Sequence, residues 1–157
     1  MIQVHLSEIA NALNAQLIGL DRMVESVSTN SREMEENGLF IALVGERFDA
    51  HDFCAQAVEQ GAVALLVEKK LPLNVPQLIV PDTRLALGQL GAWVFAQFDI
   101  PKVAITGSCG KTTVKEMLAS ILSLEGEVLA TQGNFNNEIG APLTLLRATQ
   151  SHKFAVI

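Results

Sequence analysis

The residues with the clearest chemical potential form a short glycine-rich segment, Gly107-Ser108-Cys109-Gly110-Lys111-Thr112. An apolar run at 102–106 precedes it and is predicted to form a buried strand. A segment with apolar residues at helical spacing, 114–122, follows it. This order of strand, glycine-rich turn, Lys-Thr and helix is typical of a phosphate-binding loop, because backbone N–H groups and the helix dipole favour an anion there.

Two side chains would complete such a site. Lys111 supplies a mobile positive charge for the outer phosphates, and the hydroxyl of Thr112 is placed to bind Mg²⁺. The strict P-loop pattern requires a glycine where this chain has Ile105, so the loop is shorter and divergent. The alternative is a structural turn with an incidental lysine. Cys109 is either a reactive thiol or the occupant of a variable loop position.

A second polar cluster contains three asparagines within four residues, Asn134, Asn136 and Asn137. Asparagine side chains are rarely buried without hydrogen-bond partners, so they suit a loop that faces phosphate, metal or substrate. Equally, Asn136 or Asn137 would serve as the N-cap of the helix that follows. The residues alone leave both interpretations open.

Composition limits the possible partners. The 157 residues are 49% hydrophobic and carry a net charge of −6, which suits a folded protein and argues against nucleic acid or an anionic membrane as the main partner. Neither a signal-peptide pattern nor an apolar run of membrane-spanning length is evident. Cys54 and Cys109 form no metal or redox motif. We therefore expect a cytoplasmic protein with reduced thiols.

Apolar periodicity and turn residues predict that helices and strands alternate, as is typical of an α/β protein. Helices are expected at about 8–14 with Ser7 as N-cap, at 50–60 ended by Gly61, from Asp82 or Thr83 to about 98, over 114–122, and up to about 147. Strands are expected near 16–18, 24–28, 39–44, 63–67, 77–80, 102–106, 127–130 and 154–157.

Two domains are expected, 1–82 and 83–157. Prolines punctuate the chain just before this boundary, and the first part has its own set of strands around a helix. The second part supplies only a few strands, whereas a sheet commonly has roughly five to six, so we expect an incomplete domain.

Several segments resemble, in order, motifs of the Mur ligases of peptidoglycan synthesis. The phosphate-loop segment 106–117 and the asparagine-containing segment 133–146 carry the strongest likeness. Ser28-Thr29-Asn30-Ser31-Arg32 resembles the family's Ser/Thr-Asp-Ser/Thr-Arg uridine-side motif, with Asn30 in place of the usual Asp. Segments 38–53 and 61–68 resemble the next two blocks. The family also lacks the first P-loop glycine.

The resemblance implies an enzyme, an ATP-dependent amide ligase that uses ATP and Mg²⁺ to add D-Ala-D-Ala to UDP-MurNAc-tripeptide through an acyl phosphate. Its fold would be a small N-terminal mixed-sheet α/β domain for the UDP precursor, followed by the start of a P-loop-type central domain for ATP. Lys111 and Thr112 would be catalytic, with Thr112 also the metal ligand. The phosphate site would comprise Gly107, Ser108, Cys109, Gly110, Lys111, Thr112, Thr113, Asn134, Asn136 and Asn137. The UDP end would contact Thr29, Asn30, Ser31, Arg32, Gly45, Arg47, Asp49 and His51.

Some roles stay open on the residues alone. Arg32 and Arg47 suit pyrophosphate or a surface ion pair, and His51 suits a UDP contact or a local hydrogen bond. In the family, a Mg²⁺-binding Glu, a carbamylated Lys and the D-Ala-D-Ala domain come later in the chain. We therefore expect a monomeric N-terminal portion, inactive alone. The alternatives are a non-catalytic UDP-sugar-binding module and a generic P-loop kinase or NTPase.

Overall fold

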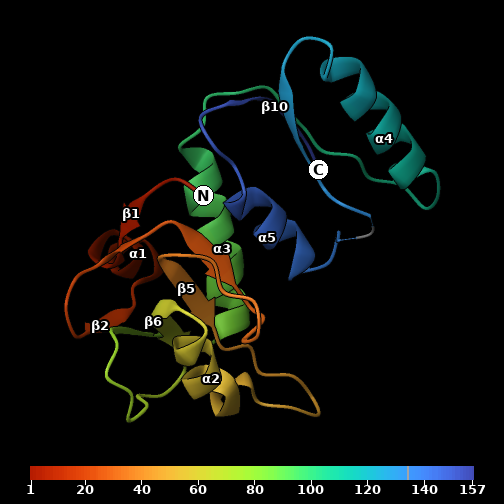
Figure 1. Cartoon of the computed structure of the whole chain (residues 1–157). Helices are drawn as coiled ribbons and strands as arrows, with labels where there is room; N and C mark the ends of the chain where they lie inside the picture. The colour runs from red at the N-terminus through yellow and green to blue at the C-terminus, as the bar shows by residue number, and fades with distance from the viewer. Residues whose placement is uncertain (134) are drawn as a thin grey trace. The chain divides into compact units, whose positions relative to one another are not determined.

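The computed structural model describes residues 1–133 and 135–157. It divides into two compact units, Met1–Leu90 and Gly91–Ile157, each with its own sheet (Figure 1). Helices and strands alternate along both units, which confirms the predicted α/β class. The division falls inside helix α3 (Thr83–Ala96), so the domain boundary between 82 and 83 stays a prediction.

A five-stranded sheet in the order β2-β7-β6-β5-β4 forms the centre of the first unit. Its strands are β2 (Gln16–Ile18), β4 (Ser26–Ser28), β5 (Gly38–Ile41), β6 (Ala62–Val67) and β7 (Gln77–Ile79). Strands β4 to β7 run parallel, and β2 is antiparallel to β7. The sheet is therefore mixed, as predicted. The apolar runs of β5 and β6 are buried almost throughout, as expected for central parallel strands.

The first helix starts earlier than predicted. Helix α1 spans Leu6–Leu13, and His5 rather than Ser7 occupies the N-cap position. The backbone N–H of His5 donates to Glu8 Oε2 at 2.9 Å, so a carboxylate from the first turn satisfies it. The Ser7 hydroxyl instead donates to Asp21 Oδ2 at 2.7 Å and ties the helix to a later loop.

The strand expected at 24–28 is divided in two. Strand β3 (Met23–Val24) pairs with β1 (Val4–His5) in a separate two-stranded sheet, while β4 joins the main sheet. The break falls at Glu25, whose N–H donates to the carbonyl of Asn37 at 3.0 Å. The chain therefore changes partner strands within this run.

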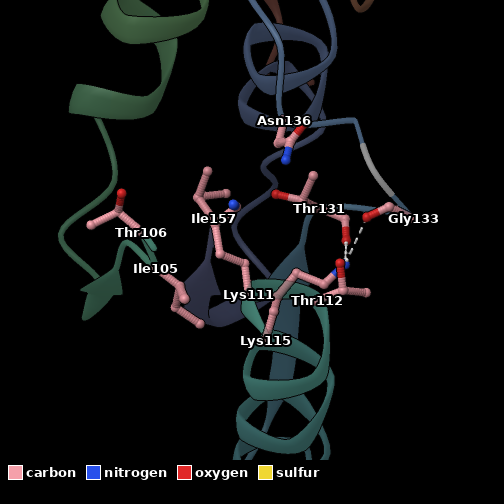
Figure 2. Close-up of a pocket in the computed structure, with 9 residues that line it drawn as sticks. All are labelled: Ile105, Thr106, Lys111, Thr112, Lys115, Thr131, Gly133, Asn136 and Ile157. Carbon is pink, nitrogen blue, oxygen red and sulfur yellow. Dashed lines mark hydrogen bonds between the residues drawn. The ribbon is translucent and has the colours of Figure 1, made fainter. Parts of the chain in front are cut away.

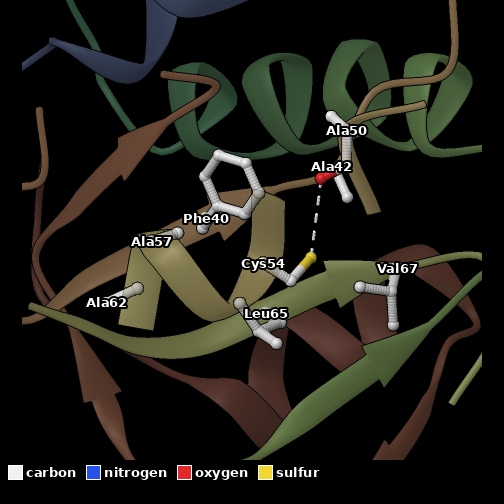
Figure 3. Close-up of a cluster of buried hydrophobic side chains, with 8 residues drawn as sticks. All are labelled: Phe40, Ala42, Ala50, Cys54, Ala57, Ala62, Leu65 and Val67. Carbon is white, nitrogen blue, oxygen red and sulfur yellow. Dashed lines mark hydrogen bonds between the residues drawn. The ribbon is translucent and has the colours of Figure 1, made fainter. Parts of the chain in front are cut away.

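A compact apolar cluster packs helix α2 (Cys54–Glu59) and the preceding 3₁₀ turn η1 (Ala50–Phe53) against the sheet (Figure 3). The helix predicted at 50–60 thus begins as a tighter turn, and Gly61, with φ +112°, follows its end as expected. The cluster consists of Phe40, Ala42, Ala50, Cys54, Ala57, Ala62, Leu65 and Val67. Phe40 is its largest side chain, and the small residues around it let the helix approach the strands closely.

The second unit contains a parallel three-stranded sheet in the order β8-β10-β9. Its strands are β8 (Lys102–Val103), β9 (Glu127–Ala130) and β10 (His152–Val156), and its helices are α4 (Lys111–Leu122) and α5 (Gly140–Leu146). The buried strand predicted at 102–106 was wrong in extent and burial. Strand β8 has two residues at the sheet edge, and Val103 is 39% exposed.

Helix α3 is capped by a side chain, and helix α4 has an unusual distribution of buried residues. Asp82 Oδ1 accepts the N–H of Leu85 at 2.9 Å, so of the two predicted caps for α3 it is Asp82 that acts. On α4, the apolar residues Val114, Met117 and Ile121 are exposed, whereas Lys115 is buried.

Within the described part of the chain, no helix has the length and apolarity needed to cross a membrane.

Candidate functional site

The glycine-rich segment connects β8 to the first turn of α4, as the sequence predicted. Gly110 is the N-cap of α4 with φ +78°, and Gly107 has φ +154°. Gly110 lies in the left-handed region, where a residue with a Cβ atom would be strained. The first turn of any helix leaves backbone N–H groups without acceptors inside the helix. The glycines therefore permit a tight turn that directs such donors toward one place.

A pocket of about 220 Å³ lies beside this turn (Figure 2). Ile105, Thr131 and Ile157, which line it, follow the carboxyl ends of β8, β9 and β10. Parallel strands commonly place ligand sites at this edge of their sheet. The remaining lining residues are Thr106, Lys111, Thr112, Lys115, Gly133 and Asn136.

Three of the predicted site residues meet in this pocket. Lys111 and Thr112 come from the first turn of α4, and Asn136 comes from the loop between β9 and α5. The ammonium group of Lys111 donates to the carbonyl of Gly107, so its side chain folds back over the loop. A cation and a hydroxyl on one helical turn, faced by a side-chain amide, form a polar cradle suited to an anion.

The other predicted residues of this site take different places. Gly107, Ser108, Cys109 and Gly110 belong to the exposed turn before α4, Thr113 is exposed in the first turn of that helix, and none of the five lines the pocket. Asn137 Oδ1 accepts the backbone N–H groups of Ile139 at 3.3 Å and Gly140 at 2.7 Å, which makes it a cap for α5. Asn134 lies outside the described residues. The two interpretations of the asparagines therefore apply to different residues, with Asn136 at the pocket and Asn137 at the helix.

Lys115 is a pocket residue that the sequence analysis missed. Only 5% of it is exposed, and its ammonium group donates to the carbonyl of Thr131 and, at 3.2 Å, to that of Gly133. It also pairs with Glu116 Oε1 at 2.9 Å. Its spacing from Lys111, one helical turn, was the available signal, because residues four apart share a helix face.

Thr131 is the second residue that was missed. It is 4% exposed, its N–H donates to the carbonyl of Val156 at 3.2 Å, and its Oγ1 has no hydrogen-bond partner among the described residues. Leaving a buried hydroxyl unsatisfied costs about 1–3 kcal/mol. A polar, oxygen-rich ligand in the pocket would relieve that cost, so the donor set fits a phosphate group.

The segments predicted to hold UDP gather at one edge of the first sheet. Residues 29–32 follow β4 and residues 45–51 lie in the chain after β5, and these parallel strands end side by side. Asn30 Oδ1 accepts the N–H of Arg32 at 3.1 Å, and Ser31 Oγ donates to Gln56 Oε1 at 2.8 Å. Asn30 therefore shapes a tight turn after the strand.

The arginines of these segments have no partner of opposite charge among the residues that the structure describes. The side chains of Arg32 and Arg47 are exposed, and neither forms an ion pair with any other residue in 1–133 or 135–157. The surface ion-pair alternative therefore finds no support in these ranges. Contact with pyrophosphate stays a prediction for both.

His51 is 6% exposed and uses both ring nitrogens. Its Nε2 accepts the backbone N–H of Glu68 at 2.9 Å, which leaves the proton on Nδ1, and Nδ1 donates to Asp49 Oδ1 at 2.5 Å. The imidazole links the 45–51 segment to the end of β6. This geometry agrees with the local hydrogen-bonding alternative, and a UDP contact for His51 stays a prediction.

The Asp49 carboxylate gives a testable pH dependence. Its pKa is lowered from the ordinary value of 3.8, first by the backbone N–H of His51, then by the imidazole and by Lys69, 3.7 Å away. The folded state therefore binds a proton less readily than the unfolded chain, so this stabilisation is present above pH 3.8 and is lost as pH falls below it.

We expect the free energy of unfolding of Asp49→Asn to fall less steeply than that of the wild type as the pH is lowered below about 4, while most of the fold stays intact. Urea unfolding between pH 2.5 and 7, roughly spanning the carboxylate range, measures this. Asp52→Asn is the matched control, because Asp52 lies in the same turn. Parallel stability curves for wild type and Asp49→Asn would contradict the assignment.

Comparisons with known proteins agree with this geometry. Residues 105–157 match the Mur ligase middle domain, and residues 23–93 match the catalytic domain of the Mur ligase family. The chain is 54% identical over 157 residues to the UDP-N-acetylmuramoyl-tripeptide–D-alanyl-D-alanine ligase of Escherichia coli, covering 100% of this chain and 35% of that protein. The chain belongs to the Mur ligase family.

Solved structures support the same assignment for this Mur ligase chain. MurF from Acinetobacter baumannii superposes with a TM-score of 0.93 and 41% identity, over 100% of this chain and 36% of that one. MurF ligase from Thermotoga maritima in complex with ADP gives a TM-score of 0.75 and 34% identity, over 85% of this chain and 31% of that one. The chain thus spans about a third of the length of the relatives that it matches. The predicted resemblance to the family is confirmed.

Proposed function

We propose that this chain carries the nucleotide-binding part of an ATP-dependent amide ligase that adds D-Ala-D-Ala to UDP-MurNAc-tripeptide in peptidoglycan synthesis. The observation that carries the proposal is the pocket at the carboxyl edge of β8, β9 and β10, where Lys111, Thr112 and Asn136 converge. The 54% identity to a ligase named for this reaction supports it.

In such a reaction a carboxylate oxygen of the tripeptide takes the γ-phosphoryl group from ATP and ADP leaves. The amine of D-Ala-D-Ala then attacks the acyl carbon, and inorganic phosphate leaves. Catalysis of phosphoryl transfer is mainly positioning and charge stabilisation. Lys111 would neutralise the outer phosphate oxygens, and the turn 107–113 would bring backbone N–H groups close to them. Asn136 would donate from the opposite wall.

The proposal also includes Mg²⁺ as a cofactor. Thr112 offers a hydroxyl at the pocket, and P-loop proteins use a hydroxyl there as a ligand. Within residues 1–133 and 135–157, no group of three or more His, Cys, Asp or Glu side chains is arranged to hold a metal ion. Mg²⁺ is commonly bound by one or two carboxylates together with substrate phosphates, so Thr112 would be one ligand among several.

The UDP end would bind at the carboxyl edge of β4 and β5. Thr29, Asn30, Ser31 and Arg32 would contact it from one side, and Gly45, Arg47, Asp49 and His51 from the other. The exposed guanidinium groups of Arg32 and Arg47 support this, because one arginine can donate two parallel hydrogen bonds to two phosphate oxygens. The net charge of −6 argues against nucleic acid or an anionic membrane as the main partner, and the proposal includes a monomeric, cytoplasmic protein as in the resemblance.

The two cysteines provide a direct test of the phosphate loop. Cys109 is exposed in the turn, whereas Cys54 is buried and burial, followed by Asp49 and Asp52, raises its pKa to about 12. We expect a disulfide reagent at about pH 8 to label Cys109 in the folded protein and Cys54 only after unfolding, since the thiolate is the reactive form. Saturating Mg·ATP should slow the labelling of Cys109 several-fold.

The matched control is Lys111→Ala, in which Mg·ATP should no longer protect Cys109. Equal labelling rates with and without Mg·ATP in the wild type would argue against a nucleotide site at this loop. If the chain binds UDP-MurNAc-tripeptide but Mg·ATP does not slow the labelling of Cys109, the result would favour the non-catalytic UDP-sugar-binding module instead.

A further inference from the structure

We infer that Lys115 is a positioning residue of the nucleotide site, which holds the carbonyls of Thr131 and Gly133 so that Thr131 Oγ1 and Asn136 face the bound phosphates. The inference rests on the proposed function and extends it to residues outside the phosphate-loop pattern. It concerns a lysine that acts through the loop after β9 rather than by direct contact with the ligand.

Burial and hydrogen bonding distinguish Lys115 from an ordinary surface lysine. Lysine is almost never fully buried unless it is paired, because removing its charge from water is costly. Here the two carbonyls and Glu116 Oε1 supply its partners. Figure 2 shows the side chain rising from α4, with its hydrogen bonds to Thr131 and Gly133 as dashed lines.

The ammonium group links two of the structural elements that line the pocket. Helix α4 contributes Lys111 and Thr112, whereas the loop after β9 contributes Thr131, Gly133 and Asn136. Lys115 lies one turn after Lys111, and it donates from this helix to two backbone carbonyls of that loop. Its loss would leave two carbonyls without their charged donor and would free the loop to move away from Lys111.

Thr131 is the residue through which the effect should reach the ligand. Its backbone is held from both sides, by the carbonyl of Val156 at its N–H and by Lys115 at its carbonyl, yet its buried hydroxyl has no partner among the described residues. A hydroxyl fixed in this way is oriented before binding, so it would hydrogen-bond a phosphate oxygen at little cost in conformational freedom.

Calorimetric titration of the 157-residue chain with Mg·ADP tests the inference. We expect Lys115→Met to weaken binding about tenfold or more, because Thr131 Oγ1 and Asn136 would no longer be held in position to hydrogen-bond a charged ligand. Lys115→Arg should restore part of the affinity, since a guanidinium group also donates to two carbonyls. Lys153→Met, which removes an exposed lysine from the same unit, should change the affinity less than about twofold.

A double-mutant cycle with Thr131→Val separates positioning from general stability. Valine removes the hydroxyl but keeps the carbonyl that Lys115 holds, so Thr131→Val should weaken binding without lowering the melting temperature of the ligand-free chain. If Lys115 acts through Thr131, the double variant should bind about as weakly as Lys115→Met alone. Hydrogen exchange at the amide of residue 131, which donates to the carbonyl of Val156, should accelerate in Lys115→Met and not in Thr131→Val.

The outcomes distinguish this inference from the proposed function. A wild-type chain that fails to bind Mg·ADP would overturn both. Normal binding by a folded Lys115→Met variant would overturn the inference alone, as would losses that multiply in the double variant. If Lys115→Met does not fold, Lys115→Arg decides the question through its affinity and its exchange rate at the Thr131 amide.

Discussion

Lys111→Ala is expected to lower kcat by about 10²–10³-fold in a chimeric ligase in which this chain replaces the matching segment of the Escherichia coli enzyme. The chain aligns over its whole length with that enzyme at 54% identity, which makes the exchange practicable. Lys111 projects from the first turn of α4 into the pocket. Alanine keeps the helix but removes the positive charge that would meet the transferring phosphoryl group.

The assay is ADP release with UDP-MurNAc-tripeptide and D-Ala-D-Ala present. Lys153→Ala in the same chimera is the control for loss of one positive charge, and we expect it to retain nearly full turnover. Equal loss of kcat and kcat/KM would indicate an interaction made mainly in the transition state. A Lys111→Ala chimera with more than about a third of the parent turnover would show that this loop is not the phosphate site.

Much of the fold could be predicted because the local signals agree with the tertiary structure. Strands β6 and β9 have apolar or β-branched residues bounded by turns, and both occur close to where they were expected. Gly61 follows α2, and Asp82 caps α3, because these residues satisfy backbone requirements that depend only on the nearby chain. Such local requirements are readable without knowledge of the packing.

The errors arose where a distant partner decides the outcome. Ser7 has the side chain of an N-cap, but Asp21 takes its hydroxyl and the helix begins before it. The run 102–106 is apolar enough for a central strand, yet strand β8 lies at the edge of its sheet and is short. In both cases periodicity describes the residues correctly but does not say which neighbour they meet.

The candidate site shows the same division. The phosphate loop could be predicted, since its glycines and Lys111 are adjacent in sequence and their roles follow from one turn. The contribution of Lys115 could not, because it depends on the carbonyls of Thr131 and Gly133, which lie 16 and 18 residues later in the chain and meet the helix only in the folded structure. Asn136 and Asn137 could not be told apart from composition, since they differ only in which backbone groups lie near each.

The pocket also depends on the tight packing around Gly140. Gly140 is buried at the start of α5, and a Cβ atom there would lie 2.7 Å from Phe135 Cα and 2.8 Å from its carbonyl carbon. These are backbone atoms, so the clash cannot be relieved by rotating a side chain. The residue after Phe135 is Asn136, which lines the pocket. A methyl group at Gly140 would therefore displace the wall that faces Lys111.

We expect Gly140→Ala to weaken Mg·ADP binding about tenfold or more and to lower the melting temperature, since overpacking typically costs about 1–3 kcal/mol. Gly88→Ala is the matched control, because Gly88 lies in α3 and a Cβ atom there meets nothing within 4 Å. That substitution should leave binding unchanged and raise stability by up to about 1 kcal/mol. Calorimetry with Mg·ADP and the amide shifts of Phe135 and Asn136 measure both effects. Wild-type affinity together with unshifted amides in Gly140→Ala would mean that the close approach of α5 to this loop does not shape the pocket.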